Sequence, residues 1–108
     1  MAETRAALIY TPLPDAQTAR GIAAALLAEG LIACANILAP MESVFIWEDS
    51  RESASEVPVL FKTTAQQMER AVERLAALHP YTTPAIVASV CDAASPDTLE
   101  WLISQTQG

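Results

Sequence analysis

The sequence is poor in the residues that most enzyme and nucleic-acid sites require. It has one histidine, His79, two cysteines far apart, and three glycines, Gly21, Gly30 and Gly108. We therefore find no nucleophile with a neighbouring base, no glycine-rich phosphate loop and no zinc-type cysteine cluster. Six basic residues against thirteen acidic ones give a net charge of −7, so we expect no nucleic acid partner. The sequence predicts that the chain is not an enzyme.

Long apolar runs are missing too. No run approaches the roughly 20 apolar residues of a membrane-spanning helix, and residues 1–5 show no cleavage site of a signal peptide. We therefore expect no membrane partner and a cytoplasmic location. The two cysteines, Cys34 and Cys91, lie in apolar, strand-like runs, and without a secretion signal we expect both to be reduced and buried in the core.

What the chain does have is apolar residues, which make up 52% of its 108 positions. A chain of this length forms a single domain, residues 1–108, with room for one core. So high an apolar share in so small a chain suggests that a partner subunit covers part of the surface. The acidic side chains then serve chiefly to keep the domain in solution.

The chain is organised around a long apolar hairpin over residues 31–64. Its parts, in chain order, are an incoming arm at 31–38, a break at 39–41, a continuation at 43–47 and an outgoing arm at 56–63. Residues 48–53 are all polar or charged, which predicts a turn in solvent. Pro58 has no N–H, so we expect it to face away from a neighbouring strand or to lie at a bulge. A hairpin of this length exposes strand edges unless another chain pairs with them.

Strand and helix signals alternate through the rest of the chain. The expected elements are a strand at 5–11 ended by the prolines at 12 and 14, a helix between Asp15 and Gly30, a second helix between a capping box at 64–67 and His79, a strand at 85–91, and a short helix opened by Ser95 and Pro96. Strand, helix, hairpin, helix, strand is the order of the ferredoxin-like, or split βαβ, fold. We therefore predict an α+β fold with an antiparallel sheet, two helices on one face, a long hairpin and a short C-terminal helix.

Three aromatic side chains are expected at a subunit interface. Phe45 and Trp47 share one face of the incoming arm, and aromatic pairs at this spacing pack against a neighbour. We therefore expect Trp47 to be a structural anchor near the hairpin tip and not a ligand stacker. Trp101 lies about 200° round the last helix from Leu99, off its apolar side. The uncovered face of the sheet favours the same partner subunit.

Polar groups suited to recognition lie on the segment 78–84, which two prolines stiffen. It carries His79 and Tyr81. His79 is either a binding residue or a helix C-cap whose ring bonds the last-turn carbonyls or packs at an interface. Lys62, at the end of the outgoing arm, is either a ligand-facing cation or an ordinary strand-end charge.

Several short motifs together resemble the CutA family of divalent-cation tolerance proteins. In order, they are LIACANI at 31–37, SVFIWE at 43–48, Glu56 with Val57, KTT at 62–64, HPYxxP at 79–84 and LEWL at 99–102. The resemblance implies a ferredoxin-like protomer, a tight trimer whose hairpins pair across subunits, a cytoplasmic location, and a link to copper and other divalent ions. It also implies an architecture shared with the PII signalling proteins, which bind small effectors in clefts between subunits.

The chain departs from the family pattern at several positions. These are Asp49 and Ser50 where the hairpin turn usually has Gly-Lys, Tyr10 for a cysteine and Leu78 for the first of two histidines in copper-binding members, Ala85 for a glutamate, and Thr98 for an aromatic residue. Of the copper ligands of such members, His79 is the one present here. The resemblance therefore implies no firm cofactor and only weak binding of Cu(II) or another divalent cation at His79.

The sequence thus predicts a non-enzymatic homotrimer of the CutA type, associated with the response to divalent ions, copper above all. The alternative is a PII-like signalling or scaffold trimer that binds a small-molecule or protein partner between subunits. Lys62, Tyr81 and Glu56 are then the cleft residues, beside His79. A hydrolase of the acylphosphatase type shares the fold, but the sequence has no arginine-rich anion loop.

Overall fold

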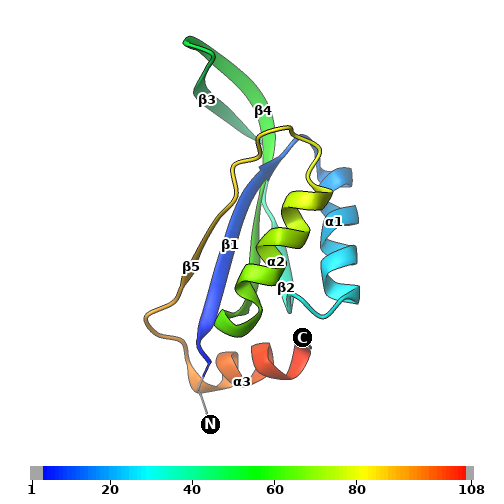
Figure 1. Ribbon diagram of the computed structural model, residues 1–108, viewed down its shortest axis with the longest axis vertical. Coiled ribbons are helices and arrows are strands. Elements are labelled where there is room, and N and C mark those ends of the chain that lie inside the picture. The colour runs from blue at the N-terminus through cyan, green and yellow to red at the C-terminus, as the bar shows by residue number, and fades with distance from the viewer. Residues whose placement is uncertain (1–3, 107–108) are drawn as a thin grey trace.

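The computed structural model describes residues 4–106, in which five strands form one sheet accompanied by three helices (Figure 1). In chain order the elements are β1 (Ala6–Leu13), α1 (Ala16–Ala28), β2 (Cys34–Ile37), β3 (Met41–Trp47), β4 (Ser50–Thr64), α2 (Ala65–Leu78), β5 (Val87–Val90) and α3 (Pro96–Gln105). The ferredoxin-like, α+β prediction for the protomer is therefore confirmed. Within the described residues, no helix is both long enough and apolar enough to cross a membrane.

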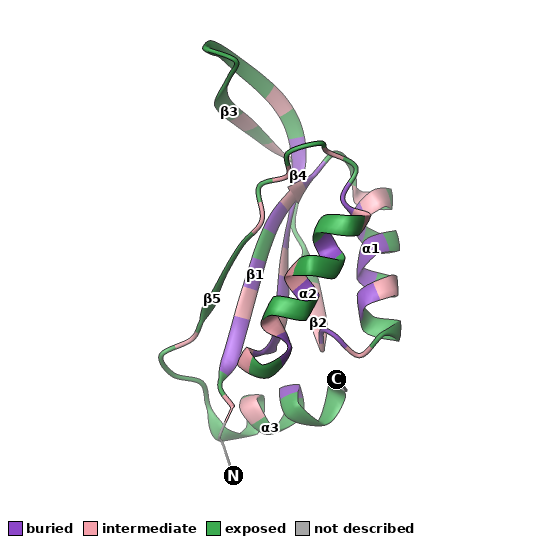
Figure 2. Cartoon of the chain, viewed as in Figure 1, coloured by how far each residue is buried: buried purple, intermediate pink, exposed green. Residues whose placement is uncertain are grey.

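The sheet is antiparallel, with strand order β2-β4-β1-β5, and β3 pairs with β4 beyond this row. Ile9 on β1 lies opposite Phe61 on β4, and both are fully buried. Helices α1 and α2 both pack on this face of the sheet (Figure 2). The core is formed by Ile9, Leu13, Ala19, Ile22, Ala23, Leu26, Leu31, Ile32, Val59, Phe61, Ala71 and Leu75.

Helices α1 and α2 do not cover the opposite face of the sheet, which carries exposed apolar side chains. Side chains alternate along a strand, so Tyr10 points away from the face that Ile9 buries. Tyr10 is 36% exposed, and Val87, which pairs with it from β5, is 63% exposed. This is the uncovered face that the sequence predicts.

The β3–β4 hairpin projects beyond the rest of the protomer (Figure 1), and its turn is shorter than expected. Trp47 pairs with Ser50, so the turn consists of Glu48 and Asp49. Both have positive φ, 49° and 66°, as a two-residue type I′ turn requires. The prediction of a turn over 48–53 is therefore wrong. The polar residues after Asp49 belong to β4 and pair with β3 through their backbone, while their side chains stay in solvent.

β1 continues to Leu13, past the proline expected to end it. Pro12 lies opposite Pro58 of β4. The Pro58 carbonyl accepts the N–H of Leu38 at 3.0 Å, and the Pro12 carbonyl lies 3.0 Å from His79 Nε2. The nitrogen and carbonyl of a strand residue point to the same side, so the two prolines face away from each other. No ladder hydrogen bond between β1 and β4 is lost. Pro58 faces away from β1 but toward the chain at Leu38, so the expectation that it faces no neighbouring strand or lies at a bulge is met only on the side of β1.

The ends of α1 agree with the sequence. The Asp15 side chain accepts the Thr18 N–H at 2.7 Å, and Gly30, just past the helix, has a φ of 71°, which glycine adopts without strain. This hydrogen bond holds the pKa of the Asp15 carboxyl below its usual value.

The capping box expected at 64–67 does not form. Thr64 makes no side-chain bond to the helix, and the Oε1 atom of Gln67 is buried without a partner among the described residues. Thr64 is the last residue of β4, where it pairs with Ala6. The sheet pairing therefore determines the conformation of Thr64. The Gln66 N–H instead donates to the Thr4 hydroxyl at 3.2 Å.

The last strand and the cysteines differ from the sequence prediction. β5 covers four residues, Val87–Val90, rather than 85–91, and as an edge strand it is exposed throughout. Cys34 and Cys91 are free, as expected, but they are half-buried and do not belong to the core. Cys34 lies at the start of β2 and Cys91 just after β5, so both are at the margin of the sheet.

Candidate functional site

The segment from His79 to Ala85 passes over the end of β1 on its way from α2 to β5 (Figure 1). It brings three of the expected site residues together. The rings of His79 and Tyr81 have their centroids 4.9 Å apart, and the Tyr81 hydroxyl donates to Glu56 Oε2 at 2.7 Å. β1, β4 and this segment therefore meet at one polar cluster.

Both ring nitrogens of His79 have partners. Nδ1 lies 3.2 Å from the backbone nitrogen of Tyr81, and Nε2 lies 3.0 Å from both the Pro12 carbonyl and the Thr11 hydroxyl. The Thr11 hydroxyl donates to the Ala85 carbonyl at 2.8 Å. Because a backbone N–H can only donate, Nδ1 accepts, and the proton lies on Nε2.

The environment of His79 favours its neutral form. The side chain is only 7% exposed, and this burial lowers its pKa from 6.5, although the Pro12 carbonyl and the negative charge of Glu56 oppose the shift. Neutral imidazole is also the form that fits its partners, since protonation of Nδ1 would set two N–H donors against each other. Of the two roles left open by the sequence, the ring contacts match the structural one, although the carbonyl it reaches belongs to β1 and not to the last turn of α2.

Glu56, which is buried, pairs with the half-buried Tyr81. Glu56 is 7% exposed, and within residues 4–106 the bond from Tyr81 is the one hydrogen bond of its side chain. Burial, together with the bond to the Glu56 carboxylate, raises the pKa of Tyr81 to about 12. Tyr81 therefore stays a neutral donor at physiological pH.

Lys62 is not part of this cluster. It lies on β4, opposite Leu8 and Cys34, and six positions of strand separate it from Glu56, about 20 Å at the rise of a β-strand. Within one protomer, the sequence-derived set of Lys62, His79, Tyr81 and Glu56 is therefore divided into a cluster of three and a distant lysine.

The residues expected at an interface are exposed in the protomer. Phe45 is 40%, Trp47 48% and Trp101 44% exposed. Figure 2 shows that the whole outer part of the hairpin is exposed or half-buried. Their role at an interface stays a prediction.

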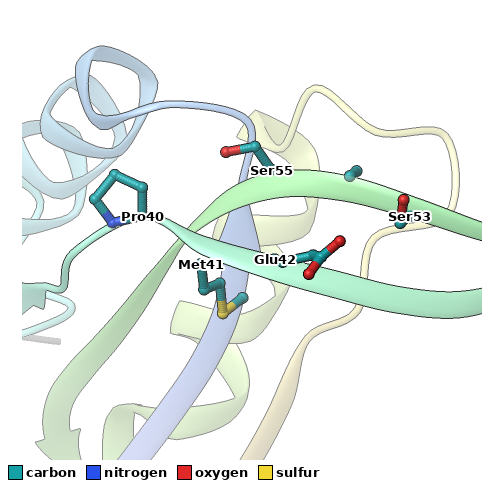
Figure 3. A pocket seen from close by; sticks show the side chains of 6 residues that line it. Pro40, Met41, Glu42, Ser53 and Ser55 are labelled. Atoms are coloured by element: carbon teal, nitrogen blue, oxygen red, sulfur yellow. The ribbon is translucent and has the colours of Figure 1, made fainter.

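An open cavity of about 450 Å³ lies where the hairpin leaves the sheet (Figure 3). It is lined by Pro40, Met41, Glu42, Ser53, Ala54 and Ser55. It offers one carboxylate and two hydroxyls, and none of His79, Tyr81, Glu56 and Lys62 lines it. The cavity therefore does not coincide with the expected site.

Sequence reasoning missed the part of Thr11 in this cluster. Thr11 is fully buried and connects the His79 ring to the Ala85 carbonyl. The sequence could have revealed this role. Thr11 lies two positions after Ile9 on β1 and therefore shares the face that packs in the core, although it is polar. A buried hydroxyl needs a partner. Ala85 acts through its backbone, which no side-chain motif reveals.

The described residues do not form a metal site within one protomer. Residues 4–106 contain no group of three or more histidine, cysteine, aspartate or glutamate side chains close enough to hold a metal ion. A stable transition-metal site takes three or four such ligands in fixed geometry. The one histidine has both ring nitrogens in other bonds. Within one protomer, the described residues therefore do not supply the ligand set of a stable transition-metal site.

Comparisons with known proteins agree with the fold. The sequence model of a family described as "CutA1 divalent ion tolerance protein" matches residues 7–105. The chain is 39% identical over 100 residues to the divalent-cation tolerance protein CutA of Pyrococcus horikoshii, covering 93% of this chain and 97% of that one. It is 36% identical over 99 residues to the protein of the same name from Thermus thermophilus, covering 92% of this chain and 96% of that one.

Solved structures of divalent cation tolerance proteins also match this chain closely. The crystal structure of the divalent ion tolerance protein CutA1 from Ehrlichia chaffeensis superposes with a TM-score of 0.92 at 34% identity, over 99% of this chain and 100% of that one. A structure from Archaeoglobus fulgidus, described as that of a periplasmic divalent cation tolerance protein CutA, has a TM-score of 0.89 at 32% identity, over 94% and 99%. From the family match, the identities and these superpositions, the chain belongs to the CutA1 family of divalent ion tolerance proteins.

Proposed function

We propose that this chain is a non-enzymatic homotrimer that takes part in the response to divalent cations. The observation that carries the proposal is the apolar hairpin, which the protomer leaves in solvent. Val44 is 65% and Ile46 69% exposed, and β3 has β4 as its one recorded neighbour in the sheet among residues 4–106. An exposed apolar edge strand of this kind pairs with another chain.

The uncovered face of the sheet supports the same assembly. Tyr10 and Val87 are exposed side by side on that face, and Trp101 is exposed on α3. Burying these residues together with the hairpin would give the apolar interface of an obligate oligomer. Three copies are proposed because the resemblance of the sequence motifs to the CutA family implies a trimer.

Light scattering at low micromolar protein tests the assembly. A mass three times the 11.5 kDa of one chain is expected, with an unfolding midpoint that rises with protein concentration. A folded monomer at that concentration would contradict the proposal.

For the cation response we propose weak binding of Cu(II), ahead of other divalent ions in the usual order of affinities. The family name supports a link to divalent ions, whereas the donor set of one protomer supports no tight site. We therefore expect a dissociation constant of about 10 μM or weaker for an incomplete set of ligands. A Cu(II) titration at pH 7.5 against a chelator of known affinity tests this, and submicromolar binding would refute it.

A second function, PII-like binding of a small molecule or a protein between subunits, is favoured by Glu56. A carboxylate this buried, with a phenol and no recorded ion pair among residues 4–106, is suited to a cationic or hydrogen-bond-donating partner. Calorimetry with nucleotides, whose N–H and O–H groups can donate to Glu56, tests the cleft, and their affinity should fall with salt if Lys62 takes part. Heat from a nucleotide that disappears in Glu56→Gln would favour this function over the cation response.

We also propose a cytoplasmic location. The two free thiols, Cys34 and Cys91, suit a reducing compartment. Fractionation of cells that express the chain at native level tests it, and recovery in the periplasmic fraction would place this protein with the Archaeoglobus fulgidus relative.

A further inference from the structure

His79 is the one histidine in the chain, and the unprotonated nitrogen of its ring already accepts a hydrogen bond. A metal ion binds an unprotonated ring nitrogen. In His79 that nitrogen is Nδ1, which accepts the Tyr81 N–H at 3.2 Å. A metal at Nδ1 would displace this N–H and leave it without an acceptor.

The other ring nitrogen offers no alternative. Nε2 lies 3.0 Å from the Pro12 carbonyl oxygen, which can only accept, and 3.0 Å from the Thr11 hydroxyl, whose proton goes to the Ala85 carbonyl at 2.8 Å. Removing the Nε2 proton would place a lone pair against two oxygens that have no proton to give. A metal at Nε2 would have to push Pro12 and Thr11 aside in the interior of the fold.

The same contacts connect three parts of the chain that are far apart in sequence. Through its two nitrogens, His79 joins the end of α2 to β1 at Pro12 and to the Tyr81 backbone. Thr11 extends the connection to Ala85, just before β5. Tyr81 is then held at its backbone by the ring and at its hydroxyl by Glu56.

We infer that His79 is a structural latch and not a metal ligand: with Thr11 it closes the segment from His79 to Ala85 over the end of β1 and positions Tyr81 against Glu56. Divalent cations that this chain binds are held elsewhere. Only the metal titration that tests this inference rests on the proposed cation response. The inference itself does not depend on the proposed trimer.

The first experiment observes the ring directly in the wild-type protein. Long-range proton–nitrogen NMR spectra should show one tautomer, protonated at Nε2, and the ring resonances should not move when one equivalent of Zn(II) is added per chain. A stoichiometric shift of the Nδ1 or Nε2 resonance would overturn the inference, and so would the opposite tautomer.

The second experiment compares two variants that weaken the same latch. Thr11→Val removes the hydroxyl and keeps the imidazole, whereas His79→Gln removes the imidazole and keeps a donor and an acceptor. If His79 is a latch, both variants lower Tm, by about 5 °C or more, and the Cu(II) affinity of each stays within about twofold of wild type. A tenfold loss of Cu(II) affinity in His79→Gln with none in Thr11→Val would identify His79 as a ligand.

Two controls keep the outcomes separate. If either variant fails to fold, the Zn(II) titration of the wild-type ring still decides the inference. Light scattering on the same wild-type sample reports the assembly independently. A monomeric wild type would refute the proposed trimer while the ring spectra still confirm or overturn the latch.

Discussion

Tyr81 and Glu56 are 25 positions apart in sequence and are joined by a 2.7 Å hydrogen bond from the phenol hydroxyl to Oε2. The bond connects the segment after α2 to β4. Because Glu56 is almost fully buried, its carboxylate depends on this donor in place of solvent. The pair is the best-defined polar contact of the candidate site, and several expected outcomes depend on it.

Tyr81→Phe should destabilise the protein by about 1–3 kcal/mol, because a buried carboxylate oxygen loses its partner. Urea unfolding of the two proteins measures the difference. Equal stability of the two proteins would mean that the bond to Glu56 contributes nothing.

Tyr81 should also make stability depend on alkaline pH. Its pKa is raised from 10 to about 12 in the folded protein, so the folded state keeps a proton that the unfolded state has lost. The contribution is complete below pH 10 and disappears as the pH rises from 10 to 12. Tyr81→Phe should show a shallower fall in the free energy of unfolding across this range, and parallel curves for the two proteins would contradict the assignment.

The sequence was enough for the order and type of the elements, because each depends on local patterns. Asp15 and Gly30 predicted the ends of α1, and Ser95 with Pro96 predicted the start of α3. The prediction of a capping box at 64–67 was wrong because Thr64 belongs to β4 and pairs with Ala6, a long-range contact that a local motif does not reveal. The prediction of a turn over 48–53 was wrong for a similar reason. The polar residues after Asp49 resemble a loop in sequence, and only their pairing with β3 shows that they form a strand.

The candidate site was predictable only in part. His79 and Tyr81 stood out by residue type and by the prolines around them, and Glu56 by its place in a family motif. The hydrogen bonds of His79 to Pro12 and Thr11 come from the folding of β1 under this segment. Lys62 was grouped with these residues, but it lies about 20 Å further along the same strand within one protomer. Only a second copy of the chain could bring such a lysine to the cluster.

His79 should make the protein less stable in mild acid. Its pKa is lowered in the folded state by burial, so the unfolded chain takes up a proton first. The contribution is present above pH 6.5 and is lost as the pH falls below it through the folded pKa. The free energy of unfolding should therefore drop more between pH 7.5 and pH 5.5 in wild type than in His79→Gln, and an equal drop would show that another group causes it.

Ile46→Glu should prevent assembly, since it places a charge on the most exposed apolar side chain of β3. Leu27→Glu on α1 is the control, because Leu27 is also strongly exposed, at 46%, but lies on the helix layer. Light scattering at low micromolar protein should give a smaller particle for Ile46→Glu and an unchanged one for Leu27→Glu. A trimer that survives Ile46→Glu would remove the hairpin from the interface.

Trp47→Ala should weaken the assembly by roughly 3 kcal/mol or more, if the trimer buries the indole that one protomer leaves half exposed. The measurement is the concentration dependence of the unfolding midpoint for the two proteins. A change under roughly 0.5 kcal/mol would place the ring in solvent, and Trp47 would then not be an interface anchor.

Pro12 and Pro58, which lie opposite each other on β1 and β4, also restrict how these two strands can align. A slip of β1 by one residue would turn the Pro12 nitrogen toward β4, opposite a carbonyl that then lacks a donor. The same slip would bring Tyr10 into the core in place of Ile9. A one-residue slip is therefore penalised twice, once in the backbone and once in the side chains. The two prolines, which cannot donate a hydrogen bond within a sheet, thus help to exclude odd-numbered slips between its two longest strands.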